Sequence, residues 1–186
     1  MTDTAFDTAF RIVVGIEGGY TPAKPSDPGG ETKFGISKAA YPHLDIPGLT
    51  LDKAKAIYFT DYWLVMLCDR LPWLLALPLF DGAVNHGVTA AAVMFQRALG
   101  NVAVDGKMGP QTITVAKAGH LDTTLVHFMG HRAMAYASDP HYRENGEGWF
   151  RRAFSIVWLV DNDKPEPDLV RWFRTFGPVV LRAFLP

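Results

Sequence analysis

The sequence predicts a mainly α fold, lysozyme-like in its helix content, and three observations support this. Apolar residues recur at helical spacing along most of the 186 residues, and little of the chain shows the alternation that is typical of strands. Hydrophobic residues make up 48% of the chain and aromatic residues 12%, so a substantial core can form. Glycine and proline gather between the periodic segments, where they mark turns. The length fits one globular domain, or a domain with a small lobe.

The first expected helix carries Phe6, Phe10, Val13 and Val14 on one face, with Thr2, Asp3 or Thr4 as its N-cap. We expect Gly18-Gly19 to end it. Residues 20–36 are rich in Pro, Gly, Ser, Thr and Asp, which indicates an irregular loop or a small hairpin. Thr50 or Asp52 can cap a second helix that reaches about Trp63. Further helices are expected at Trp73–Asn85, Thr89–Leu99, Pro110–Gly119, Asp122–Ala137 and Trp149–Val160.

The most apolar segment of the chain is Leu64–Phe80. Asp69, Arg70 and two prolines interrupt it well short of the length of a membrane span, so a buried helix is the better prediction. Cys68 lies within this segment, and we expect it to be an inert buried thiol. It is the single cysteine of the chain, so no intrachain disulfide can form, as in a protein made in the cytoplasm.

The charge balance restricts the choice of partners. Lys and Arg number 18, Asp and Glu number 19, and the formal net charge is -1. A charged fraction of 20% argues against disorder. Nucleic-acid binding usually requires a strongly basic face, so we expect no nucleic-acid partner. We also expect a monomer.

Glu17 is the first candidate for catalysis. It follows Val13 by four residues and Phe10 by seven, a phase that places it on the apolar face of the first helix. In the expected last turn, the negative end of the helix dipole also disfavours a second negative charge. Burial and dipole both raise the pKa of a carboxyl group, and a glutamate that keeps its proton near neutral pH suits a general acid. The alternative is a glutamate that turns out to water beside the two glycines.

The turn-rich segment 27–36 supplies further polar groups. Hydrolysis of a glycoside needs a proton donor and a second polar group that attacks or activates water. Asp27 can be that second group, and Thr32 can help to hold the water. Both residues also suit a purely turn-stabilising role, and Glu31 is a competing carboxylate that spacing does not exclude.

These residues carry a resemblance to a known family. The motif Glu17-Gly-Gly-Tyr20, followed by Asp27-Pro-Gly-Gly30, Thr32 and Gly35-Ile36-Ser37, resembles glycoside hydrolase family 108. Its members are N-acetylmuramidases found as phage endolysins and as bacterial muramidases. The resemblance implies that Glu17 is the catalytic acid. The order Glu, Asp, Thr is also similar to that of phage T4-type lysozymes, which implies a water-positioning role for Asp27 and Thr32.

A second segment, Asp81-Gly-Ala-Val-Asn85-His-Gly87, resembles the family's aspartate and asparagine on a helix that faces the cleft. Asp81 and Asn85 are four residues apart and hence on one helical face. The resemblance implies that they bind sugar hydroxyls. The alternative is a helix C-cap with a solvated aspartate. His86 is close to the expected cleft, and we assign it no proton transfer.

The resemblance extends through residues 6–160. Residues 95–112 resemble a peptidoglycan-binding part, and Gly146–Arg152 resembles the family's closing Gly-Trp-x-x-Arg segment. We therefore expect a catalytic segment at 1–88, a helical peptidoglycan-binding part at 89–160 that packs on it, and a C-terminal tail at 161–186. Tyr20 and Trp149 are the aromatic residues expected to bind substrate.

Together these features predict an endolysin-type N-acetylmuramidase, in which Glu17 protonates the leaving oxygen of the β-1,4 bond between N-acetylmuramic acid and N-acetylglucosamine. Peptidoglycan is the expected partner, and the expected chemistry needs no metal or organic cofactor. The alternatives are a lytic transglycosylase, a chitinase and a non-catalytic wall-binding module. Residues 1–11 contain no signal-like apolar run, so we expect synthesis in the cytoplasm, release by another agent, and action in the periplasm or cell wall.

Two further features carry weaker hypotheses. His127 and His131 have the spacing of two zinc ligands, but no third ligand is evident, and surface or interface histidines are the better prediction. The tail has an apolar stripe of Phe173, Phe176, Val180 and Phe184 flanked by arginines. The break at Gly177-Pro178 favours docking of the tail onto the core over contact with a membrane.

Overall fold

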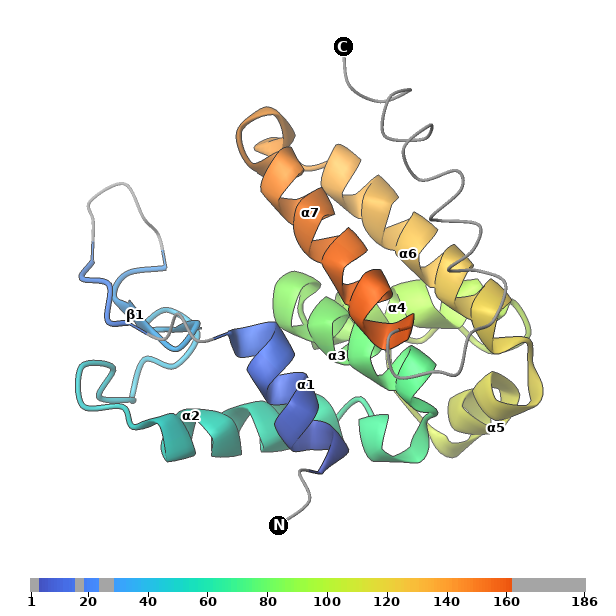
Figure 1. Ribbon diagram of the computed structural model, residues 1–186, viewed down its shortest axis with the longest axis horizontal. Coiled ribbons are helices and arrows are strands. Elements are labelled where there is room, and N and C mark those ends of the chain that lie inside the picture. The colour runs from blue at the N-terminus through green and yellow to red at the C-terminus, as the bar shows by residue number, and fades with distance from the viewer. Residues whose placement is uncertain (1–3, 16–18, 24–28, 162–186) are drawn as a thin grey trace.

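The computed structural model describes residues 4–15, 19–23 and 29–161, and within them the fold is mainly α with one small hairpin (Figure 1). This confirms the predicted fold class. In chain order the elements are α1 (Ala5–Val14), β1 (Thr32–Lys33), β2 (Ile36–Ser37), α2 (Leu51–Tyr58), the π-helical turn η1 (Phe59–Leu64), the 3-10 turn η2 (Cys68–Arg70), α3 (Trp73–His86), α4 (Val88–Leu99), α5 (Pro110–Ala118), α6 (Leu121–Ala137) and α7 (Tyr142–Asp161). The predicted tail stripe at 173–184 lies outside the described residues.

Helix α1 begins at the predicted cap and ends earlier than expected. Thr4 forms a capping box with Asp7, and Lys55 forms an ion pair with Asp7 that ties α2 to this end of α1. The hydrogen bonds from Lys55 and Thr4 hold the pKa of Asp7 well below its ordinary value. At the other end, Gly15 adopts φ 70° and caps the helix after Val14. The expected end at Gly18-Gly19 is therefore wrong, because an earlier glycine already takes the left-handed conformation that stops a helix.

The predicted hairpin is present, and its turn is anchored to α2. Strands β1 and β2 pair antiparallel, with Thr32 opposite Ser37, and Thr21 adds a bridge to Thr32. The turn between the strands is held by Tyr58 of α2, whose hydroxyl donates a hydrogen bond of 3.1 Å to the carbonyl oxygen of Phe34. Gly35 sits directly over this hydroxyl with φ 75°. The hairpin is thus anchored to the helical core through one buried tyrosine.

Replacement of Gly35 by Ala is expected to destabilise the protein more than the same change at Gly87. Both glycines have a positive φ, which costs an L-residue about 1–2 kcal/mol. An added Cβ at Gly35 would also lie 2.5 Å from the Tyr58 hydroxyl oxygen, whereas nothing lies within 4 Å of one at Gly87. Urea unfolding of both variants measures the difference. Equal losses would show that the close contact costs nothing, and combining Gly35→Ala with Tyr58→Phe should recover part of the loss.

Only the second half of the apolar segment Leu64–Phe80 forms the predicted buried helix. Thr50 caps α2 as predicted, and the helix continues through η1 before the chain turns at Leu67, which has φ 51°. Pro72 then precedes α3, which is buried from Leu74 to Ala83. Cys68 is buried, as predicted, and its burial raises the pKa of the thiol. No helix within the described residues is long and apolar enough to cross a membrane.

Helix α3 lies at the centre of the molecule and contacts α1, α4, α6 and α7 (Figure 1). An aromatic cluster joins α3 to α1 and to the helix formed by α2 and η1. The rings in contact belong to Phe6, Phe10, Tyr58, Trp63 and Phe80. Aromatic pairs of this kind add stability beyond the area that they bury. This cluster fixes the position of α1, and with it the start of the segment that contains Glu17.

Among the C-terminal helices, the start of α7 differs from the prediction. Helices α4, α5 and α6 lie where the sequence predicts them, but α7 starts at Tyr142 and not at Trp149. The helix runs through Gly146 and Gly148. Gly146 is buried and its Cα faces the ring of Tyr142, so a side chain at this position would meet that ring. The helix therefore continues through two residues of low helix propensity.

In the part that resembles a peptidoglycan-binding unit, Gln96 has a structural role. The amide of Gln96, buried on α4, donates to Asp105 Oδ1 (2.8 Å) and to the carbonyl oxygen of Lys107 (3.0 Å), and it accepts from the backbone of Gly106 (2.9 Å). The hydrogen bond from Gln96, followed by one from the backbone N–H of Lys107, lowers the pKa of Asp105. One glutamine thus shapes the loop that connects α4 and α5.

Candidate active site

Two of the three predicted catalytic residues, Glu17 and Asp27, lie outside the described residues. The structure nevertheless changes one argument about Glu17. Helix α1 ends at Val14, three residues before Glu17, so the described helix gives no support to the argument from its dipole. Its role as the acid stays a prediction that rests on the motif and on its position two residues after Gly15.

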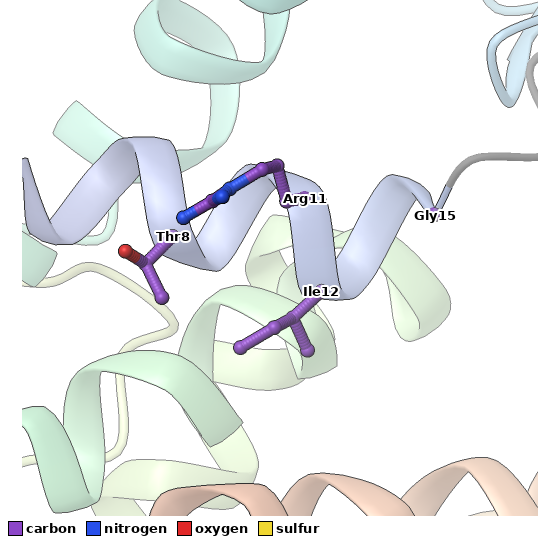
Figure 2. Close-up of a pocket in the computed structure, with 4 residues that line it drawn as sticks. All are labelled: Thr8, Arg11, Ile12 and Gly15. Atoms are coloured by element: carbon purple, nitrogen blue, oxygen red, sulfur yellow. The ribbon is translucent and has the colours of Figure 1, made fainter. Parts of the chain in front are cut away.

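An open hollow runs along α1 toward this end of the helix (Figure 2). It is lined by Thr8, Arg11, Ile12 and Gly15, and Figure 2 shows all four on the same helix. The lining is mostly apolar. The hollow therefore marks an accessible face of α1, and the four described residues that line it include no carboxyl group.

The third predicted catalytic residue, Thr32, is held by backbone hydrogen bonds on both sides of β1. It exchanges two such bonds with Thr21, of 2.8 and 2.9 Å, and it is paired with Ser37 of β2. Its side chain is half-buried. A residue on paired strands is positioned more rigidly than one in a free loop, which suits a group that orients a water molecule. The catalytic role itself stays a prediction.

Tyr20 and Glu31 form a pair beside the hairpin. The Tyr20 hydroxyl donates a hydrogen bond of 2.9 Å to Glu31 Oε2, and 45% of the Tyr20 side chain is exposed. This bond to Glu31 raises the pKa of Tyr20. Glu31, the competing carboxylate, thus has a local partner, and the exposed ring of Tyr20 remains able to meet a sugar.

Asp81 is at the centre of a buried ion cluster. It is fully buried, and its two oxygens accept hydrogen bonds from Arg132 Nη2 (2.6 Å) and Arg152 Nε (2.7 Å). Arg132 is fully buried as well. A carboxylate with both oxygens engaged by guanidinium groups has little left to offer a sugar, and its burial rules out the solvated C-cap. The placement favours a structural role for Asp81, in which its charge compensates two arginines.

The cluster reaches α1. Arg152 Nη2 donates a second hydrogen bond, of 3.2 Å, to the carbonyl oxygen of Val13 in the last turn of α1. The backbone carbonyls at a helix end have no partner within the helix, so a guanidinium group is well suited to satisfy one. Arg152 therefore joins α7, α3 and α1 at the point where the chain leaves α1 for Glu17.

Three rings are in contact beside this cluster, and those of Tyr136 and Trp149 are stacked. The ring of Tyr136 lies 4.5 Å from that of His86 and 5.4 Å from that of Trp149, measured between centroids. The Tyr136 hydroxyl donates to Asn85 Oδ1 at 2.9 Å. Asn85 is exposed and Trp149 is half-buried, so the structure brings these two predicted binding residues to one surface. An amide beside an aromatic ring is a common arrangement for binding sugars, although the binding role stays a prediction.

His86 is positioned as an acceptor. Its Nε2 lies 3.4 Å from Arg132 Nε, and burial together with the nearby Arg132 lowers its pKa to about 4. The side chain is therefore neutral at neutral pH, and an imidazole with this pKa has no proton to give there. This agrees with the decision to assign it no proton transfer.

The lowered pKa of His86 predicts how stability changes with pH. In the unfolded chain the imidazole titrates near 6.5, and in the folded protein near 4, so the unfolded state takes up the proton first as pH falls. The free energy of unfolding should therefore decrease between pH 6.5 and 4. Urea unfolding across this range should show a smaller decrease for His86→Gln than for the wild type. Parallel curves for the two proteins would contradict the assignment.

The histidine pair with the spacing of zinc ligands lies on α6. His127 is exposed and His131 half-buried on α6. Among residues 4–15, 19–23 and 29–161, no group of three His, Cys, Asp or Glu side chains is placed to hold a metal ion. The described residues thus add no third ligand to the two histidines.

Three residues of this region were missed by the sequence analysis, although a signal for two of them exists. Arg132 and Tyr136 continue the spacing of Leu125 and Phe128, which form the buried face of α6. An arginine in phase with such a face needs a buried partner, and Asp81 in the apolar helix α3 was the obvious candidate. Arg152 occupies the arginine position of the Gly-Trp-x-x-Arg segment, but its contact with α1 follows only from the three-dimensional arrangement.

The fold and the comparisons together define the class of the protein. It is a mainly α, lysozyme-like protein with a function of the peptidoglycan-hydrolase type. Residues 10–87 match the family glycosyl hydrolase 108, and this segment of the chain belongs to that family. Among solved structures, SagA from Brucella abortus is similar with a TM-score of 0.75 and 28% sequence identity, over 83% of this chain and 92% of that one. No curated protein has a matching sequence.

Proposed function

We propose that the protein is an N-acetylmuramidase that hydrolyses the β-1,4 bond between N-acetylmuramic acid and N-acetylglucosamine in peptidoglycan. One observation carries the proposal. The segment that matches glycosyl hydrolase 108 contains Glu17, Asp27 and Thr32 in an order similar to that of phage T4-type lysozymes, and Thr32 lies on a strand pair anchored to the core. The expected roles are proton donor for Glu17 and water positioning for Asp27 and Thr32.

The exposed surface beside the ion cluster supports the same substrate. Trp149 stacks on Tyr136, which fixes the indole ring in place without covering it fully. A rigid aromatic face can pack against the apolar face of a sugar ring, and the amide of Asn85 beside it can bond to hydroxyl or acetamido groups. Tyr20, on the hairpin side, offers a second aromatic surface. Because the substrate is a wall polymer, we propose that the protein acts in the periplasm or the cell wall.

The proposal is tested by the products of purified peptidoglycan incubated with the folded protein. A muramidase releases fragments that end in reducing N-acetylmuramic acid, which mass spectrometry identifies. A lytic transglycosylase uses no external water and leaves 1,6-anhydro ends, which would overturn the hydrolytic step. Sedimentation with the wall and no released fragment would support a binding module in place of an enzyme. Cleavage of glycans that lack the lactyl group would indicate a chitinase.

A further inference from the structure

We propose that Arg152 is a positioning residue for the reaction, in that it fixes the end of α1 from which the chain continues to Glu17. This inference rests on the proposed function, because it concerns the same active site. Arg152 donates to Asp81 Oδ1 at 2.7 Å and to the Val13 carbonyl oxygen at 3.2 Å, so one guanidinium group joins three helices. Val13 precedes Glu17 by four residues.

The direction of the Arg152 side chain is set by its buried partner. Asp81 is fully buried and is bound on its other oxygen by Arg132, which is fully buried too. The guanidinium plane of Arg152 therefore has one fixed anchor, and charge-assisted hydrogen bonds of this kind are short and directional. Its second donor then reaches the backbone of α1. Movement of the end of α1 relative to α3 would break this bond and leave a helix-end carbonyl without its partner.

The charge of Arg152 suits this position for a second reason. A cation at the C-terminal end of a helix interacts favourably with the helix dipole. Two arginines and one aspartate leave the cluster with one excess positive charge, since His86 is neutral at neutral pH. That charge also acts on Tyr58, whose hydroxyl holds the hairpin turn. Arg152 thus contacts the end of α1 and acts electrostatically on the tyrosine that anchors the hairpin carrying Thr32.

A positioning role has a kinetic consequence that differs from loss of a binding contact. Displacement of a reacting group by about 1 Å can reduce a rate by roughly 100-fold, while binding of the substrate elsewhere is unaffected. For Arg152→Gln we expect kcat on soluble peptidoglycan fragments to fall about 10- to 100-fold, with KM changed by less than about twofold. For Arg152→Lys, which keeps the charge but has a single donor group, we expect a partial recovery of kcat.

The matched control is Arg151→Gln on the same helix. Arg151 is exposed and is bonded to Glu147, one turn away, so its replacement should leave kcat and KM unchanged. The unfolding midpoints of all variants are measured first, and assays are run where each is fully folded. If Arg152→Gln does not fold, Arg152→Lys carries the test. Wild-type kcat in a folded Arg152 variant would overturn the inference.

The same series separates this inference from the proposed function. If the wild type cleaves glycan, Glu17→Gln does not, and Arg152→Gln matches Arg151→Gln, the positioning role alone is refuted. If the wild type releases no fragment, or Glu17→Gln is as active as the wild type, the proposed function is refuted and the role of Arg152 with it. A selective fall in kcat for Arg152→Gln supports both.

Discussion

Replacement of Glu17 by Gln is expected to slow glycan cleavage about 100- to 10,000-fold, the range in which a positioned general acid accelerates a reaction. Glutamine has the same shape but cannot give a proton to the leaving oxygen, so binding should persist while the chemical step fails. The release of reducing ends from purified peptidoglycan measures the rate, and sedimentation with the wall measures the binding. We expect a large loss in the first and none in the second.

The matched control for this experiment is Glu31→Gln. Glu31 lies in the same segment of the chain, and its carboxylate already accepts the hydrogen bond of Tyr20. A glutamine at this position keeps an acceptor for that bond, so activity should remain within about twofold of the wild type. Loss of activity in Glu31→Gln together with normal activity in Glu17→Gln would move the role of the acid from one residue to the other.

The second large effect is expected at Asp81, and it concerns stability. Asp81→Asn removes the negative charge that compensates Arg132 and Arg152, while it keeps the size of the side chain. Removal of one partner from a buried ion pair costs about 3–5 kcal/mol, because the remaining charge stays buried without compensation. Arg132 is fully buried and meets this condition. We expect the free energy of unfolding, measured in urea, to fall by about this amount.

A surface ion pair provides the control for Asp81→Asn. Glu147 and Arg151 are both largely exposed, and pairs of this kind contribute little to stability. Glu147→Gln should therefore leave the urea midpoint close to that of the wild type. A small loss for Asp81→Asn, similar to that of Glu147→Gln, would mean that the cluster is hydrated in solution and that its burial has been overstated.

Hydrophobic periodicity and capping residues were sufficient to predict most of the helices. Thr50 starts α2, Pro110 is the first residue of α5, and α3 begins at Trp73, as the sequence indicates. These are local features, because a cap or an apolar stripe acts within one or two turns of the chain. The hairpin after α1 was predicted for the same reason, from turn-forming residues concentrated in one segment.

The start of one helix and the contacts between distant parts of the chain could not be predicted. Helix α7 starts at Tyr142, seven residues before the predicted Trp149, and it runs through Gly146 and Gly148. Arg132 and Arg152 bond to the two oxygens of Asp81 from 51 and 71 residues away, which no local signal predicts, and the role of Asp81 in binding sugar stays a prediction. Of the proposed site, the sequence predicts the residue types of Glu17, Asp27 and Thr32 through their motif. It contains no comparable local signal for the bond between α7 and the end of α1.

The buried ion cluster also has a consequence for how the chain can be divided. Asp81 lies inside the segment 10–87 that matches the hydrolase family, whereas Arg132 and Arg152 lie beyond it. Cut out alone, that segment would retain an acidic group in its most apolar helix with neither counterion, and α3 would lose its contacts with α4, α6 and α7. We therefore expect that the segment 10–87 does not fold on its own. Its stability depends on α6 and α7, and we expect the two parts of the chain to fold and unfold together.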